Sequence, residues 1–239
     1  MTSPAGPFLI GEAMTGGYGP TDILHACTIS VDKGKIAVIV GPNGAGKSTA
    51  MKAVFGMLKL RGGHVRIRGE DITHLSPRER VEKGMAFVPQ TSNVFPSLSV
   101  EENLEMGAFL RRDDIRASME QVYALFPVLK QKRRQAAGEL SGGQRQQVAV
   151  GRALMTDPEV LMLDEPTAGV SPIVMDELFD RIIEVARAGI TILMVEQNAR
   201  QALEIADTGF VLVQGRNAYT DTGKALLANP EVRRTFLGG

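Results

Sequence analysis

The chain has 239 residues, a length typical of one large α/β domain with a buried core. Lys plus Arg and Asp plus Glu each number 27, so the formal net charge is zero, which argues against binding to the phosphate backbone of a nucleic acid. Cys27 is the one cysteine, so we expect no disulfide framework and a reducing compartment.

The apolar runs of the chain are short. The longest, such as Ile36–Val40, fall far below the roughly twenty residues that a membrane-spanning helix needs. The first cation is Lys33, so no basic segment precedes an apolar stretch at the N-terminus, and we expect no signal peptide. We therefore expect any membrane role to arise through a partner.

Short apolar runs alternate with helical patterns over most of the chain, which predicts an α/β fold with helices packed on a sheet. The strand candidates are Ile36–Val40, Met85–Val88, Val160–Leu163, Ile190–Val195 and Phe210–Val213. Each is largely apolar on both faces, as expected for a strand covered on both sides. The segment His64–Arg68 instead alternates between polar and apolar residues, which predicts an edge or hairpin strand.

Strand patterns are absent from Ser99 to Gln135, where Val100–Leu110 and Ile115–Leu125 show helical spacing. We interpret this stretch as part of a small helical subdomain, about residues 91–156, inserted in the α/β core. No internal repeat or linker stands out, so residues 1–239 are predicted to form a single domain.

A phosphate-binding loop is indicated by Gly41-Pro42-Asn43-Gly44-Ala45-Gly46-Lys47-Ser48, which fits G-x-x-x-x-G-K-[ST] between a strand and a helix. Glycines allow backbone N–H groups to surround phosphate oxygens, and a helix N-terminus adds partial positive charge. Lys47 is placed to contact the β- and γ-phosphates, and Ser48 to bind Mg²⁺. The alternative is a glycine-rich turn with an incidental lysine. The loop alone leaves kinases, GTPases and ATPases open, although no Asn-Lys-x-Asp guanine-binding motif is present.

A second anion site is indicated by Leu140-Ser141-Gly142-Gly143-Gln144, which opens a helical pattern from Arg145 to Met155. Ser141 suits an N-cap, and the two glycines expose backbone N–H groups at the helix start. One nucleotide could lie between this site and the phosphate loop if two chains met head to tail.

Two carboxylates follow the apolar run Val160–Leu163. Ligands collect at the carboxyl ends of parallel strands, so Asp164 and Glu165 are expected beside the phosphate loop. Asp164 is placed to hold Mg²⁺, and Glu165 to orient the attacking water and accept its proton. The alternative is an ordinary acidic helix start before Pro166.

With these three motifs in this order, the chain resembles the ATP-binding-cassette (ABC) ATPases over essentially its whole length. The resemblance implies a P-loop NTPase fold with a RecA-like core, an N-terminal antiparallel β subdomain and a small α-helical subdomain. It also implies that two chains enclose two ATP–Mg²⁺ between them. Lys47, Ser48, Asp164 and Glu165 of one chain would then face Ser141 and Gly143 of the other.

The resemblance assigns roles to further residues. Tyr18 matches the aromatic residue that stacks on adenine, although an ordinary surface tyrosine remains the alternative. Thr49 should contact the α-phosphate. Gln90 matches the glutamine that links Mg²⁺ and water to the helical subdomain, with a simple turn residue after Pro89 as the alternative. Gln197 occupies the position of the family's usual histidine, where it can donate a hydrogen bond to the γ-phosphate but cannot carry a proton.

A narrower resemblance concerns the cargo. Val195-Glu196-Gln197-Asn198, the segment 168–172 and the tail Thr222–Gly239 are similar to the second ATPase subunit of branched-chain (hydrophobic) amino-acid importers. The implied partners are a paralogous ATPase subunit or a second copy, two transmembrane permease subunits and, through them, an external solute-binding protein, with no nucleic acid. The implied location is the cytoplasmic face of the inner membrane. The alternatives are a translation- or DNA-associated cassette ATPase, or an importer of another small solute.

Overall fold

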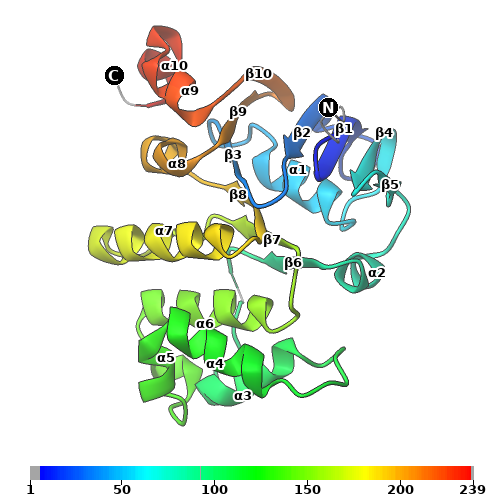
Figure 1. Ribbon diagram of the computed structural model, residues 1–239. Helices are drawn as coiled ribbons and strands as arrows, with labels where there is room; N and C mark the ends of the chain where they lie inside the picture. Colours follow the sequence, from blue (N-terminus) through cyan, green and yellow to red (C-terminus); the bar gives the residue numbers. More distant parts are fainter. Residues whose placement is uncertain (1–5, 92, 238–239) are drawn as a thin grey trace, which may run out of the picture.

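The structure is a computed structural model that describes residues 6–91 and 93–237 (Figure 1). Residues 1–5, 92 and 238–239, which belong to the predicted single domain, lie outside the described residues. The larger sheet contains, in spatial order, β10 (Arg216–Asp221), β9 (Thr208–Val213), β3 (Ile36–Val40), β8 (Thr191–Val195), β7 (Val160–Asp164) and β6 (Met85–Val88). The strands from β9 to β6 run parallel, and β10 pairs with β9 in the antiparallel sense.

The smaller sheet is antiparallel and contains, in spatial order, β2 (Leu24–Val31), β1 (Leu9–Gly16), β4 (Leu60–Ile67) and β5 (Glu70–Asp71). The helices are α1 (Lys47–Val54), α2 (Pro77–Glu82), α3 (Val100–Gly107), α4 (Arg116–Leu125), α5 (Pro127–Gln131), α6 (Gly142–Leu154), α7 (Pro172–Arg187), α8 (Ala199–Ile205), α9 (Gly223–Ala228) and α10 (Pro230–Phe236), with a 3₁₀ turn η1 (Ala137–Glu139) before α6. None of the helices within the described ranges is long and apolar enough to cross a membrane.

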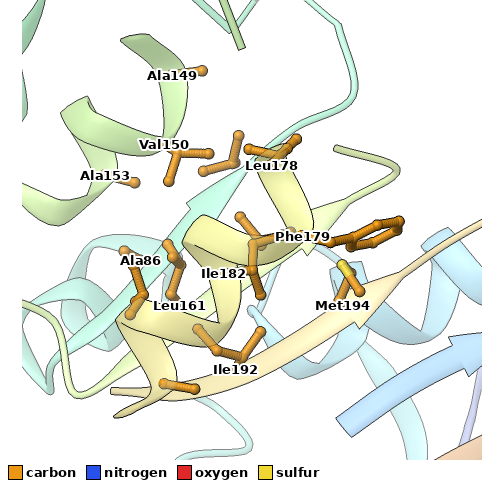
Figure 2. Close-up of a cluster of buried hydrophobic side chains, with 14 of the residues drawn as sticks. Ala86, Ala149, Val150, Ala153, Leu161, Leu178, Phe179, Ile182, Ile192 and Met194 are labelled. Carbon is orange, nitrogen blue, oxygen red and sulfur yellow. The ribbon is translucent and has the colours of Figure 1, made fainter. Parts of the chain in front are cut away.

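The larger sheet is buried on both faces. In β3, Val38 belongs to the hydrophobic cluster on one face and Ile39 to the cluster on the other. On the first face, Leu178 and Ile182 of α7 pack near Val150 of α6 and the strands below (Figure 2). The opposite face is covered by α1 and the smaller sheet. This burial explains why the predicted strands are apolar at consecutive positions.

The predicted core strands are confirmed, with small shifts at their ends. The strand predicted from Ile190 begins at Thr191, and the strand predicted from Phe210 begins at Thr208. The predicted hairpin strand His64–Arg68 corresponds to the second half of β4, which ends at Ile67 and forms a hairpin with β5.

The pattern of residues alone did not reveal β1 and β2. Ala13 and Ala26 have φ values of 47° and 56°, in the left-handed region, and the register between these strands shifts twice. Such irregularities break the period of two on which strand prediction depends. The antiparallel subdomain was expected from the family resemblance instead.

The helices α3 to α6 form a layer below β6 and β7 (Figure 1). Capping boxes fix the starts of two of these helices. In α6, Ser141 is the N-cap, as predicted, and forms a capping box with Gln144, so the helix begins at Gly142. A capping box between Ser99 and Glu102 fixes the start of α3 at Val100, and the helix ends at Gly107 rather than at Leu110.

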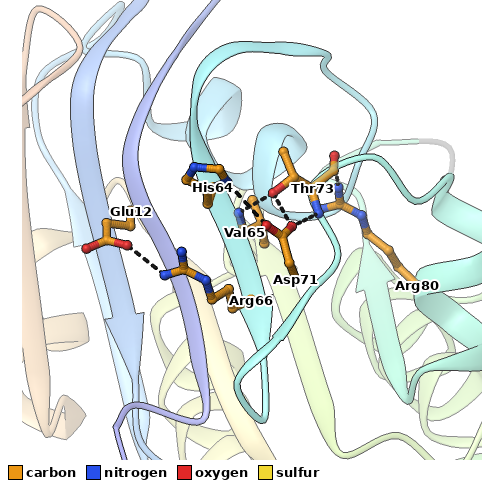
Figure 3. Close-up of polar contacts among 7 residues, drawn as sticks. All are labelled: Glu12, His64, Val65, Arg66, Asp71, Thr73 and Arg80. Atoms are coloured by element: carbon orange, nitrogen blue, oxygen red, sulfur yellow. Dashed lines mark hydrogen bonds and ion pairs between the residues drawn. The ribbon is translucent and has the colours of Figure 1, made fainter.

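A buried arginine connects α2 to the end of α1. Arg80 is 1% exposed, and its guanidinium donates hydrogen bonds to the carbonyls of Ala53, Val54, Leu75 and Thr73, the last of them drawn in Figure 3. Burial lowers the pKa of Arg80 to about 10, so the side chain stays charged at neutral pH. A cation at this end of α1 also complements the helix dipole.

We therefore expect Arg80→Met to lower the free energy of unfolding by about 3 kcal/mol, because several buried carbonyls lose their donor. Urea denaturation measures the change. Arg78→Met is the matched control, since Arg78 lies on the same helix with a side chain that is 76% exposed, and it should change stability little. Equal stability of the two variants would show that the carbonyls around Arg80 do not need its guanidinium.

Candidate active site

Four parallel strands deliver polar residues to one edge of the larger sheet. The phosphate-binding loop follows β3, Asp164 ends β7, Glu196 follows β8, and Gln90 comes two residues after β6. These strands are neighbours in the order β3-β8-β7-β6, so their carboxyl ends lie together.

The phosphate-binding loop has the backbone that its glycines permit. Gly44 and Gly46 have φ values of 78° and 95°, which other residues rarely adopt. A Cβ on Gly41 would lie 2.3 Å from the Leu212 carbonyl oxygen of β9, so this position admits only glycine. The loop opens on a cavity of about 350 Å³ whose lining residues in the described chain are Ile23, Asn43, Gly44, Ala45, Gly46, Lys47, Ser48, Thr49 and Glu165.

Lys47, the first residue of α1, is 5% exposed. Its ammonium group donates hydrogen bonds to the carbonyl oxygens of Gly41 at 2.8 Å and Pro42 at 3.1 Å. Burial lowers the pKa of Lys47, and the nearby carboxylates of Glu165 and Asp164 oppose that shift. The loop thus encloses a cation beside its own backbone N–H groups, which suits the site to a phosphate.

The next residue of α1 contacts the end of β7. Asp164 continues the face of the strand that Val160 and Met162 turn toward α1, and its Oδ1 accepts a hydrogen bond of 2.9 Å from the Ser48 hydroxyl. Burial raises the pKa of Asp164, whereas the bond from Ser48 lowers it.

This oxygen pair fits Mg²⁺. Magnesium prefers oxygen ligands and commonly takes only one or two from the protein, with phosphate and water supplying the rest. The described residues contain no group of three or more His, Cys, Asp or Glu side chains that could hold a metal by themselves. Ser48 and Asp164 therefore suit an ion that arrives with a nucleotide.

Glu165 lies where two cavities meet. Its φ of 48° turns the chain out of β7, and its Oε2 accepts a hydrogen bond of 2.7 Å from the Gln90 side chain. It lines both the phosphate-loop cavity and a second cavity of about 320 Å³, to which Gln197 also contributes. The structure thus brings Glu165, Gln90 and Gln197 to the same edge as the phosphate loop.

Two expected nucleotide contacts lie outside the phosphate-loop cavity. Tyr18 lies in the loop between β1 and β2 and is 50% exposed, whereas Ile23 of the same loop lines the cavity. The segment Ser141-Gly142-Gly143-Gln144 lies at the N-terminus of α6, with Ser141 and Gly142 exposed. Gly143 packs against α7, where an added Cβ would lie 2.3 Å from Val174.

Sequence analysis missed a buried carboxylate at this edge. Glu196 is 1% exposed and accepts hydrogen bonds from Thr167 and from the Gln197 backbone. Burial raises the pKa of Glu196, and these hydrogen bonds oppose the shift. A carboxylate directly after four consecutive apolar residues was the available signal, since so deep a position requires polar partners.

Comparison with known proteins gives a consistent result. A family model described as "ABC transporter" matches residues 24–168. The chain is 45% identical to the high-affinity branched-chain amino acid transport ATP-binding protein BraG of Pseudomonas aeruginosa, over 93% of this chain and 96% of that protein. It is 40% identical to the probable branched-chain amino acid transport ATP-binding protein LivF of Archaeoglobus fulgidus, over 94% of this chain and 96% of that protein. The structure is also similar to a crystal structure of the ADP conformation of an ATP-binding cassette from an ABC transporter. The match covers 98% of this chain and 99% of that protein's chain, with a TM-score of 0.85 and 31% sequence identity.

Gln197→Ala should raise the activation free energy of ATP hydrolysis by about 1–3 kcal/mol, and so lower turnover, if the side chain hydrogen-bonds a phosphate oxygen more strongly in the transition state. Steady-state hydrolysis kinetics give the change. Gln197→His should support activity and add an inflection near neutral pH, because imidazole titrates there and an amide does not. An alanine variant with native turnover would place this position outside the chemistry.

Proposed function

Because the chain belongs to the ABC transporter family, we propose that it hydrolyses ATP at the edge of its larger sheet to drive import of branched-chain, hydrophobic amino acids. The observation that carries this proposal is the cavity at the phosphate loop. Its lining residues include Lys47 with its buried ammonium, Ser48, whose hydroxyl donates to the Asp164 carboxylate, and the carboxylate of Glu165. The names of the two protein relatives support the cargo.

The phosphates of ATP bind in the phosphate loop, with Lys47 at the β- and γ-phosphates and Thr49 at the α-phosphate. Tyr18 stacks on the adenine from the loop beside Ile23. Ser48 and Asp164 hold Mg²⁺, which neutralises charge on the phosphate oxygens when it is bound.

Glu165 orients the attacking water and accepts its proton. Its carboxylate needs a fixed direction for this task, and the hydrogen bond from Gln90 supplies one. Gln197 faces the second cavity beside Glu165, from which it donates to the γ-phosphate. Positioned donors and bases of this kind account for most of the catalysis in phosphoryl transfer.

The site is completed by a second chain. Ser141 and Gly142 are exposed at the start of a 13-residue helix, whose first N–H groups have no acceptor within the helix. These residues do not line the chain's own phosphate-loop cavity, so we propose that they bind the nucleotide held by a partner. The partner is a paralogous ATPase subunit, or a second copy of this chain, in head-to-tail arrangement.

An apolar groove of about 460 Å³ fits a helix of a transmembrane permease subunit. It lies between the strand β6 and the helices α2, α3 and α6, and it includes Phe87, Phe95, Met106 and Phe109. Phe109 is 73% exposed and Met106 45%, so the groove presents apolar surface that a partner helix would cover. We place α3 and α6 in a helical subdomain of about residues 91–156.

The groove and the site share an element. Phe87 of β6 lines the groove, and Gln90 after the same strand contacts Glu165. Movement of a permease helix in the groove would therefore reach the carboxylate through the short segment from Phe87 to Gln90. The same assembly puts the chain at the cytoplasmic face of the membrane, with an external solute-binding protein delivering the amino acid to the permease.

Glu165→Gln should keep ATP binding and reduce hydrolysis by orders of magnitude, because the amide is nearly isosteric but cannot accept a proton. Nucleotide titration and phosphate release measure the two effects. The variant should also accumulate as an ATP-bound pair of chains, visible by size-exclusion chromatography. Hydrolysis near the native rate would remove Glu165 from the role of catalytic base.

In a strain that lacks this chain, uptake of labelled leucine, isoleucine and valine should fall, while uptake of basic amino acids and sugars should not. The native gene should restore uptake, and Phe109→Asp should not, because a charge in the groove opposes docking of an apolar helix. Phe109→Leu, which keeps the groove apolar, should restore it. Unchanged leucine uptake in the absence of any redundant transporter would contradict the cargo.

A further inference from the structure

Two loops at the active edge converge on one buried carboxylate. The loop after β7 brings Thr167, and the loop after β8 begins with Glu196 and Gln197. Glu196 Oε1 accepts hydrogen bonds from the Thr167 backbone N–H at 3.1 Å and from the Thr167 hydroxyl at 2.8 Å. Its Oε2 accepts from the Gln197 backbone N–H at 3.1 Å. We call these three residues the Glu196 cluster.

The cluster resists separation of the two loops. Glu196 and Thr167 are 1% and 5% exposed, so water cannot readily replace a lost partner. An ionised carboxylate only accepts hydrogen bonds, and here each oxygen faces donors from a different loop. Moving one loop alone would leave part of a buried charge unsatisfied, which is among the more costly changes in a protein interior.

The two loops also carry distinct functional groups. Thr167 leads into Ala168, Gly169 and Val170, which line the second cavity and continue to the start of α7. Gln197 lines the same cavity from the opposite loop, and Glu165 lines it as well. A rigid connection between the loops therefore fixes the position of Gln197 relative to the segment 167–171.

We propose that Glu196 is a positioning residue that holds Gln197 and the segment 167–171 as one unit. A displacement of Gln197 at the nucleotide then also displaces the segment that leads into α7. A displacement of that segment likewise moves Gln197. This inference rests on the proposed ATP hydrolysis and adds to it a residue that does not touch the substrate.

The sharpest test is Glu196→Gln, which replaces one oxygen by an NH₂ group of nearly equal size. The amide oxygen can accept from only one of the two loops. The NH₂ group then faces a backbone N–H of the other loop, either Thr167 or Gln197, and two donors cannot bond to each other. We expect kcat for ATP hydrolysis to fall at least about 10-fold, as misplaced catalytic groups do. The KM for ATP should stay within about twofold, because the phosphate loop is untouched. The melting temperature should stay close to that of the control.

The matched control is Glu204→Gln on α8, which makes the same chemical change at an exposed residue paired with Arg200. Thr167→Val provides a second variant in case Glu196→Gln does not fold. It removes only the hydroxyl donor, and it should lower kcat in the same way. Thr167→Ser keeps the hydroxyl, so its kcat should stay close to that of the native chain. In the double variant of Glu196→Gln and Thr167→Val, the fold-decrease in kcat should be smaller than the product of the two single fold-decreases, since both substitutions disrupt the same cluster.

The outcomes are distinct. Native kcat in both Glu196→Gln and Thr167→Val overturns the inference. Loss of nucleotide binding together with a lowered melting temperature in both variants overturns it too, because that result indicates general destabilisation. All variants are assayed in the pair with the partner ATPase subunit, or as a pair of copies where the chain self-associates. If the native chain in that pair fails to hydrolyse ATP under the same conditions, it is the proposed function that fails. The Glu165→Gln variant sets the background rate for every comparison.

Discussion

Burial of the larger sheet on both faces is the constraint on which the rest of the structure depends. Strands such as β3 and β7 are closed to water along their whole length, so they tolerate polar side chains only where they end. Parallel pairing places those ends side by side. The phosphate loop, Asp164 and the Glu196 cluster follow from this arrangement, because each lies at or just after the carboxyl end of a strand whose interior is apolar.

Adjacent residues at this edge have different tasks because the backbone turns between them. Asp164 still belongs to β7 and contacts Ser48 on the α1 side. Glu165 follows in the left-handed region and instead reaches Gln90. Its backbone N–H also donates to the carbonyl of Val195, which precedes the Glu196 cluster. The peptide between Asp164 and Glu165 thus connects the contact with Ser48 to the contact with Val195, next to the Glu196 cluster.

The sequence predicted those parts of the molecule whose cause is local. Strands such as Val160–Leu163 were predictable because double-sided burial leaves an unbroken apolar run, and the phosphate loop because its glycines are required by its own backbone. Contacts between distant segments were not predictable, since nothing near Gln90 in the sequence indicates that its side chain meets Glu165. The left-handed backbone at Ala13 was equally hidden, because alanine gives no signal for it.

The hydrogen bonds of Lys47 within its own loop have a consequence for the shape of that loop. The ammonium binds the carbonyls of Gly41 and Pro42, so the cation and the backbone of the loop hold one another in place. Such contacts limit the conformational freedom that glycines would otherwise give this segment. The loop therefore owes its shape partly to a side chain that it also presents to the cavity.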